Sequence, residues 1–231
     1  MKTWQIEVNY RGIKTPIELS DKLLDSKTQE QHIKQAIEHP DDFNIPNMQL
    51  FCSIMDYIIK YNNKQSRMIR SFLKESATGN YLITSSGVLY RPTKIDTIIH
   101  DKDMPSEFID YTPMVDSDRR IIESNQEQMK ILTGLDIKQI NKITKKIFGV
   151  KPYISKLNST PIQEVYKVAR FGAYPGGANF NCHVGPDISN PTLGVCENFS
   201  ESYTTTQISR ALKETSLLGI KSILLKKLKG N

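Results

Sequence analysis

A cysteine and a histidine are adjacent at Cys182-His183, and a second cysteine, Cys196, follows them. A thiolate beside a base is a nucleophile, and Asp187 would be the third member of such a site in a hydrolase or transferase. Sequence neighbours point to opposite sides of an extended chain, however, which separates the thiol from the imidazole. These residues contain no CxxC pair, so they do not match a zinc site. We therefore favour a structural role for them and keep the enzyme as an alternative.

A second group of candidate ligands, His100, Asp101 and Asp103, follows the apolar pair Ile98-Ile99. Carboxylates at the end of a strand hold divalent cations in metal-dependent phosphoesterases and nucleases. Such sites need further carboxylates from other strands, and no spacing in this chain selects them. We therefore favour an exposed acidic turn, keep the three residues as metal candidates, and expect no cofactor.

Residues 168–199 hold five of the twelve glycines and two of the three cysteines. Adjacent glycines let a backbone approach a ligand closely, and their N–H groups can cradle an anion. Tyr174-Pro175-Gly176-Gly177 nevertheless matches neither a P-loop nor a dinucleotide-binding fingerprint. We interpret residues 168–199 as a long irregular loop or an arm that reaches a neighbouring subunit.

Charge is distributed unevenly along the chain. From Lys138 to the end there are 14 Lys and Arg against 5 Asp and Glu, a net +9, whereas the first 137 residues carry 17 against 20, a net −3. Such asymmetry suggests a polyanion or an acidic protein as the partner of the C-terminal part, although a solvated surface without a partner explains it equally well. The candidate nucleic-acid contacts are basic residues of this part: Lys138, Lys142, Lys145, Lys146, Lys151, Lys156, Lys167, Arg170, Arg210, Lys226 and Lys227.

Aromatic residues are interleaved with these lysines and arginines. They can either stack on unpaired nucleobases or fill the core. They are Tyr153, Tyr166, Phe171, Tyr174 and Phe180. Residues 140–157 also contain the Gly-Val turn of a DNA-reading helix pair. Lys145 stands where a small residue should let the two helices cross, so an ordinary helical hairpin is the favoured interpretation.

Composition indicates a soluble globular protein of one or two domains. The 231 residues are 38% apolar and 24% charged, and the chain is long enough to bury a core. Three cysteines are too few for a disulfide framework, and the N-terminus lacks a signal-peptide pattern, so we expect a cytoplasmic or otherwise intracellular protein. The apolar runs are too short to span a membrane.

Periodicity predicts the elements of the front half. Residues 4–10 and 13–19 alternate and predict an N-terminal hairpin, after which Ser20 is expected to cap a helix that ends near His39. Residues 47–61 are apolar nearly all round, which is typical of a buried central helix. A shorter helix is predicted at residues 65–75.

The remaining pattern is mixed. Residues 81–84 and 88–91 predict two strands joined at residues 85–87, a further strand follows near Ile98, and residues 100–118 predict an acidic loop. Helices are then expected at three places: residues 119–132, 136–148 and 206–228.

We therefore expect an α+β, helix-dominated fold with a small antiparallel sheet around residues 81–99 and a basic, helical C-terminal half. The expected division is a front half at 1–116 with the buried helix and a back half at 117–231, or a single domain. The leading hypothesis for function is a non-enzymatic basic protein that binds nucleic acid and/or self-assembles into an oligomer, as a nucleoprotein-like or coat-like structural protein does. An enzyme using residues 168–199 and a protein-binding adaptor remain alternatives.

Overall fold

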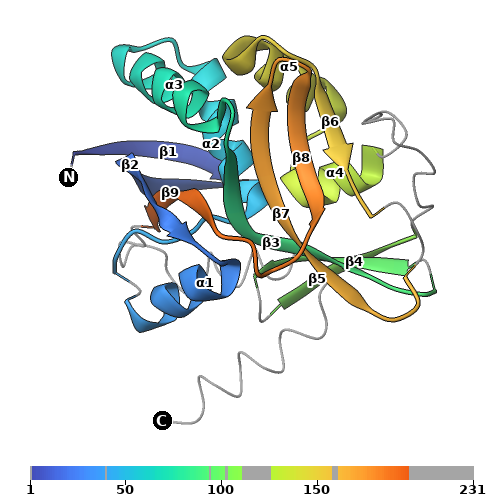
Figure 1. Cartoon of the computed structure of the whole chain (residues 1–231). Helices are drawn as coiled ribbons and strands as arrows, with labels where there is room; N and C mark the ends of the chain where they lie inside the picture. The colour runs from blue at the N-terminus through green and yellow to red at the C-terminus, as the bar shows by residue number, and fades with distance from the viewer. Residues whose placement is uncertain are drawn as a thin grey trace. The chain divides into compact units, whose positions relative to one another are not determined.

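Strands outweigh helices in the part of the chain that the structure describes. This computed structural model describes residues 2–39, 41–93, 95–101, 104–110, 126–157 and 161–197, all within one unit, Met1–Glu197. The prediction of a helix-dominated fold is therefore wrong: the fold is α+β with two sheets, and the larger sheet curls into a half-barrel (Figure 1). No helix among these residues is long and apolar enough to cross a membrane.

The described residues form nine strands and five helices. The strands are β1 (Thr3–Tyr10), β2 (Ile13–Lys27), β3 (Tyr81–Tyr90), β4 (Ile95–Asp101), β5 (Met104–Asp110), β6 (Pro152–Ser155), β7 (Val165–Tyr174), β8 (Gly177–Val184) and β9 (Asn190–Glu197). The helices are α1 (Gln29–Glu38), α2 (Met48–Lys60), α3 (Lys64–Ala77), α4 (Gln126–Thr133) and α5 (Ile137–Phe148).

The smaller sheet has the strand order β1-β2-β9 and contains the predicted N-terminal hairpin. Strand β2 continues to Lys27, so the first part of the helix predicted from Ser20 is wrong, whereas its second part is α1, which ends at Glu38 as expected. Strand β9 pairs with this extension, for example at Leu23↔Leu193, and a partner so remote in sequence holds the segment extended. Helix α1 begins only after Thr28, whose side chain accepts a hydrogen bond from the Gln31 N–H in a capping box.

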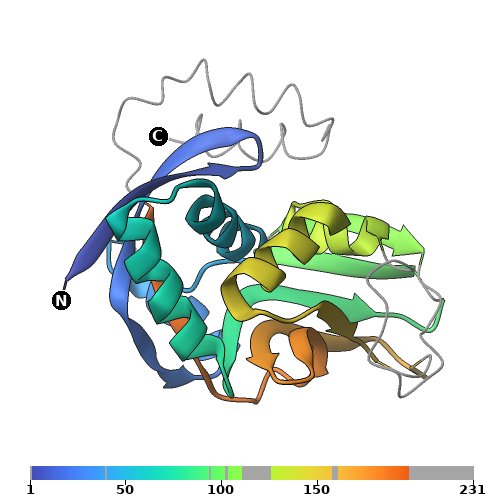
Figure 2. The same cartoon turned by 90° about the horizontal axis from the view of Figure 1, so that it is seen from above.

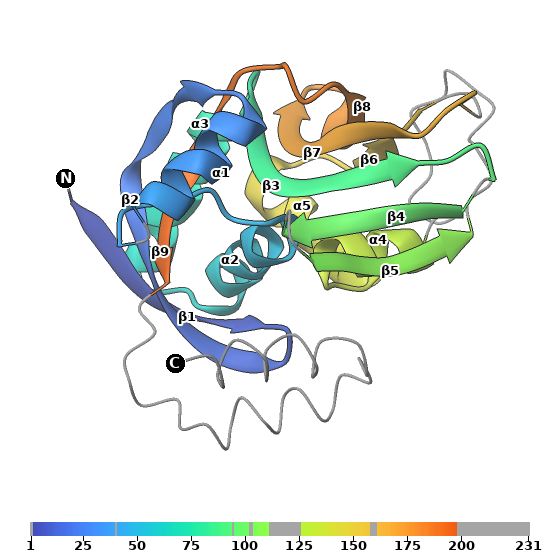
Figure 3. The same cartoon turned by 90° about the horizontal axis from the view of Figure 1, so that it is seen from below.

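The larger sheet has the order β5-β4-β3-β7-β8-β6, with β6 parallel to β8 and the other neighbours antiparallel. Figure 3 shows β4 between β3 and β5. The sheet thus takes strands from both sides of residue 116. The antiparallel pair β3–β4 lies where the small sheet was expected at 81–99, but it is part of this six-stranded sheet and not a small sheet of its own. The predicted turn at 85–87 is wrong, because β3 is one strand. Gly87 serves close packing instead, since a Cβ there would lie 2.2 Å from the Tyr166 hydroxyl oxygen.

Residues 168–199 are not an irregular loop, because most of them lie in β7, β8 and β9. Their inward positions on β7 and β8 are Ala169, Phe171, Ala173, Ala178, Phe180 and Cys182, all buried. Three of these inward residues are alanines, so the apolar period of two is weak in the sequence. After α5 the regular elements of the described residues are all strands, so the prediction of a mostly helical back half is wrong for residues 149–197.

Helices α2 to α5 pack on the inner side of the larger sheet. The predicted buried helix is α2, which contacts β1, α3, α4 and α5. Seen from above, α2 and α3 lie between the blue hairpin β1–β2 and the yellow helix α5 (Figure 2). Helix α5 begins at the capping residue Asp136 and ends at Gly149 in the left-handed conformation, as the sequence predicted for residues 136–148.

The remaining predictions concern the segment after α5, the acidic segment and the predicted helices that are not fully described. Strand β6 follows α5, so the helical hairpin expected at residues 140–157 is wrong. The acidic loop expected at residues 100–118 contains the end of β4 and all of β5. Residues 119–125 of one predicted helix, and the helices predicted at 206–228, lie outside the described residues.

Candidate nucleic-acid interface

The outer face of the larger sheet carries the most distinctive group of polar and aromatic side chains. Because side chains alternate along a strand, burial of Phe171 and Phe180 on the inner side places Arg170, Gly172 and Tyr174 of β7 on the other side. In Figure 1 this outer face of β7 and β8 lies in front of α4 and α5. Hydrophobic residues Ile45, Ile83 and Val168 bury another part of the same face.

One row of paired residues crosses four strands of this face. The register aligns Tyr81 of β3 with Gly172 of β7, Gly172 with Asn179 of β8, and Asn179 with Tyr153 of β6. Asn179 is buried and donates a hydrogen bond from Nδ2 to the Tyr81 hydroxyl oxygen at 2.8 Å. Its Oδ1 accepts a hydrogen bond from Ser155 Oγ at 2.9 Å. The amide is therefore fixed, while both tyrosine rings remain partly exposed.

At two glycines the absence of a side chain lets the tyrosine rings lie close to the backbone. A Cβ at Gly172 would lie 2.6 Å from the Asn80 carbonyl oxygen and 3.1 Å from a carbon of the Tyr174 ring. A Cβ at Gly177, where φ is +147°, would lie 2.7 Å from the Tyr153 ring. Only glycine leaves room for these rings, so the hairpin β7–β8 provides a flat floor beneath them.

Arg170 stacks on this group. Its guanidinium carbon lies 3.9 Å from the centroid of the Tyr81 ring, and its Nη1 donates a hydrogen bond to Asn190 Oδ1 at 2.9 Å. The rings of Tyr81 and Tyr174 are 5.3 Å apart between centroids. Burial, followed by the proximity of Tyr81, raises the pKa of Tyr174 to about 12, so its hydroxyl stays neutral at physiological pH. The site therefore combines aromatic faces with a fixed cation.

The basic residues predicted to contact nucleic acid fall in different places. Lys138, Lys142, Lys145 and Lys146 are exposed on α5, Lys151 is exposed before β6, and Lys167 and Arg170 are partly exposed on β7. Lys156 is buried, so it does not contribute to the surface, and burial lowers its pKa to about 7. Arg210, Lys226 and Lys227 lie outside the described residues.

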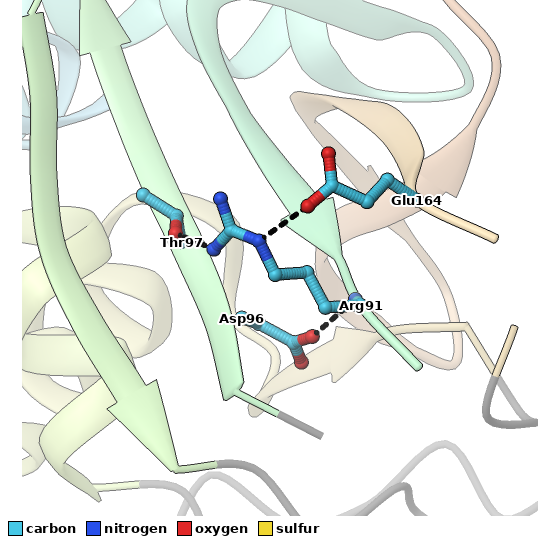
Figure 4. A network of polar contacts seen from close by, with 4 residues as sticks. All are labelled: Arg91, Asp96, Thr97 and Glu164. Atoms are coloured by element: carbon cyan, nitrogen blue, oxygen red, sulfur yellow. Dashed lines mark hydrogen bonds and ion pairs between the residues drawn. The ribbon is translucent and has the colours of Figure 1, made fainter. Parts of the chain in front are cut away.

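A polar network joins the end of β3 to the start of β4 (Figure 4). Arg91 Nε donates to Glu164 Oε1 at 2.7 Å, the Arg91 backbone N–H donates to Asp96 Oδ1 at 3.1 Å, and Nη1 donates to Thr97 Oγ1. Asp96 is buried, and desolvation raises the pKa of its carboxyl group. These contacts join the β3–β4 turn to the segment before β7, which is a structural role.

The metal candidate His100 is an internal hydrogen-bonding residue. Its Nε2 lies 2.9 Å from the Ile131 carbonyl oxygen, which can only accept, so Nε2 carries the proton. Its Nδ1 therefore accepts from Ser86 Oγ at 2.9 Å. Both nitrogens are engaged, and burial lowers the His100 pKa to about 4. No group of three metal-ligating side chains occurs among the described residues, but the side chain of Asp101 and all of Asp103 lie outside that set.

Cys182 and His183 occupy opposite faces of β8, as alternation predicts. Cys182 is buried on the inner face, and desolvation raises its pKa to about 12. His183 is exposed on the outer face, and burial of part of its ring together with the charges of Arg170 and Lys167 lowers its pKa. Asp187 is exposed in the segment after β8. This arrangement does not bring a thiolate and a base together.

Alkylation of the native protein tests the inertness of these thiols. We expect iodoacetamide at neutral pH to modify Cys196, which is partly exposed, at least about a hundredfold faster than the buried Cys182 and Cys52. A raised pKa leaves little thiolate at Cys182, and burial excludes the reagent. Mass spectrometry of peptides after timed quenching measures the modification rate of each cysteine. Denatured protein is the control, in which all three cysteines react. Rapid native modification of Cys182 would contradict this expectation.

An open groove of about 540 Å³ lies between β1 and α3. Trp4, Met68 and Phe72 provide its apolar lining, and Asp21, Lys64, Arg67, Ser71 and Glu75 complete it. Acidic and basic side chains are mixed here, so the groove favours no particular charge in a ligand.

Sequence reasoning missed Tyr81 and Asn179 as members of the outer-face site. Tyr81 was assigned only to a strand, and Asn179 was placed in a loop. The available signal was the alternation of Gly172, Tyr174, Asn179 and Asn181 with apolar neighbours.

No protein-family model matches this chain, and neither a curated protein nor a solved structure is significantly similar to it.

Proposed function

We propose that this chain is a non-enzymatic nucleic-acid-binding protein. The observation that carries the proposal is the lysine stripe of α5, which we define as Lys138, Lys142, Lys145 and Lys146. At 100° per residue these four side chains occupy an arc of about 100° on one side of the helix. The opposite side is buried through Ile140, Ile143 and Ile147. A rigid row of exposed ammonium groups matches the regular charges of a phosphate backbone.

The charges of the lysine stripe are available to a ligand. The ion pairs between described residues join Lys14 to Glu7, Lys34 to Glu38, Lys60 to Asp56 and Arg91 to Glu164. They do not involve α5. Lys145 and Lys146 also lie in the last helical turn, where they complement the helix dipole. That role stabilises the helix but does not neutralise the lysines.

The stripe continues to the edge of the larger sheet. Lys151 follows α5 and is exposed, and its carbonyl oxygen accepts a hydrogen bond from the Ala178 N–H at 2.8 Å. Strand β6 then begins and carries Tyr153 on the outer face. Lys151 thus lies in the chain between the last turn of α5 and Tyr153, at the edge strand of the larger sheet.

Salt dependence tests this proposal. We expect the protein to bind a labelled oligonucleotide of mixed sequence at about 50 mM salt, with log K falling linearly as log salt rises. Replacing the four stripe lysines by glutamine should lower affinity by about 100-fold at low salt and reduce the slope by about 3. Fluorescence anisotropy over a salt series measures both quantities.

A matched variant separates a localised site from general charge. Lys2, Lys22, Lys64 and Lys74 are exposed, lie outside α5 and take no part in the ion pairs named above, so their replacement by glutamine removes the same total charge. We expect this control to retain most of the affinity. Equal losses in the two variants, or no binding by the wild-type protein at low salt, would contradict the proposal. Binding that an acidic protein but not DNA or RNA competes away would support an adaptor instead.

A further inference from the structure

We infer that the outer face of the larger sheet binds unpaired bases, so that the preferred ligand is a single-stranded nucleic acid. The inference rests on the proposed function and adds the class of ligand. It concerns Tyr81, Tyr153 and Tyr174 with Arg170, which we call the tyrosine face.

The tyrosine face has the shape that stacking requires. Because Gly172 and Gly177 have no side chains, the rings of Tyr81, Tyr174 and Tyr153 lie close to the backbone. Arg170 already stacks on Tyr81, so Tyr153 and Tyr174 are the rings that remain for bases, and Tyr81 supports Tyr174 from the side. Tyr81 is held in place through its hydroxyl group by Asn179. Every nucleobase is a flat ring that can stack on such a surface, so stacking depends little on the sequence of the nucleic acid. Rings fixed in advance lose little conformational freedom when the base binds.

Positive charge lies beside the rings. Arg170 covers Tyr81, and its charge and that of Lys167 both act on His183, which places these three basic residues near one another on β7 and β8. The Lys151 backbone lies beside the Tyr153 ring at Gly177, and the Lys151 side chain is exposed. Phosphates that connect stacked bases would therefore meet a cation at Arg170, with Lys151 two residues before Tyr153 in the chain.

A duplex cannot use this arrangement, because its bases stack on each other and hide their faces. The lysine stripe by contrast recognises phosphates in either a single strand or a duplex. The two surfaces thus make different contributions: the stripe gives general affinity, and the tyrosine face gives preference for unpaired bases.

Two buried asparagines of β8 lie beneath the rings and support them. Asn181 aligns with Arg170 of β7 and Ser155 of β6, and Asn179 is in the row of Tyr81 and Tyr153. The Asn179 side chain already binds Tyr81 and Ser155, so it supports the rings rather than reading a base. Recognition through stacking on supported rings predicts weak dependence on sequence.

The test compares a labelled single strand of about 20 nucleotides with the duplex of the same sequence. We expect the wild-type protein to bind the single strand more tightly. In the double variant Tyr153→Ala/Tyr174→Ala this affinity should fall by about 100-fold, roughly tenfold for each ring, while duplex binding stays unchanged. The salt slope should also stay unchanged, because tyrosine is neutral. The variant Tyr153→Phe/Tyr174→Phe should bind like the wild type, since stacking needs the ring and not the hydroxyl.

Controls make the outcomes distinct. Tyr61→Ala removes an exposed tyrosine from the end of α2 and should have no effect on either ligand. Equal affinity for single strand and duplex, insensitive to the tyrosine variants, would overturn the inference and leave the proposed function standing. Absence of binding to both ligands would overturn both. Tyrosine-dependent binding to a neutral polysaccharide, without binding to the oligonucleotides, would identify a sugar site and overturn the inference.

Discussion

Replacing Phe171 by alanine should lower the free energy of unfolding by about 3–5 kcal/mol. Phe171 is fully buried, and its ring centroid lies 5.4 Å from that of Phe51, 5.2 Å from Phe148 and 5.1 Å from Phe180. These rings come from α2, α5 and β8, so one side chain joins two of the four inner helices to the sheet. Its removal leaves a cavity that three separate elements would have to fill. Urea unfolding followed by circular dichroism measures the change.

The control for this substitution is Ile162→Ala. Ile162 is fully exposed, so its truncation should change the free energy of unfolding by no more than about 0.5 kcal/mol. Phe171→Leu, which retains most of the volume, should cost about 1–2 kcal/mol. A loss at Phe171→Ala no larger than that at Ile162→Ala would show that the four rings do not form the core.

Apolar periodicity and capping residues correctly predicted the elements whose conformation depends on residues near in sequence. Helix α5 was predicted because its apolar stripe, its capping residue Asp136 and its terminal Gly149 agree with one another. Helix α2 and the N-terminal hairpin were predicted for similar reasons. Segment 20–27 was not, because its extended conformation depends on pairing with β9, far along the chain. Counting helices from periodicity therefore overestimated helix content wherever a distant strand decides the conformation.

The candidate site shows the same division between local and distant information. Charge alone made the lysines of α5 candidates, because basic residues on a helical period are visible in the sequence, and the structure places all four on the surface. The tyrosine face was not visible as a unit, since Tyr81 reaches Tyr174 and Asn179 only through the order of strands in the sheet. Glycines 172 and 177 suggested a loop, although in the sheet they make room for the rings. Lys156 counted as a surface base in the sequence but is buried.

Acidification should destabilise the protein through His100. The buried imidazole has a pKa of about 4 in the folded protein, below the ordinary value of 6.5. The unfolded chain therefore binds a proton more readily between these values, and the free energy of unfolding falls as the pH drops from 6.5 towards 4. The loss from this group reaches about 3 kcal/mol near pH 4. Urea unfolding at a series of pH values between 7 and 4 measures it.

The structure explains why the proton is unfavourable at this position. Nε2 already donates to Ile131, and Nδ1 must accept from Ser86, whose oxygen also accepts the Met48 N–H at the start of α2. A protonated ring has no acceptor left for Ser86, and the positive charge of Arg11 adds a smaller unfavourable contribution after desolvation. Acid should thus loosen the junction between β3, β4 and α2 first.

The variant His100→Gln isolates this contribution, because His32 and His183 also have lowered pKa values and add to the total acid dependence. Glutamine keeps a donor for the Ile131 carbonyl oxygen but does not titrate. The variant should be less stable than the wild type at pH 7, yet it should lose about 3 kcal/mol less on acidification to pH 4. Identical pH dependence in the two proteins would mean that His100 is not the buried neutral acceptor that the hydrogen-bond geometry requires.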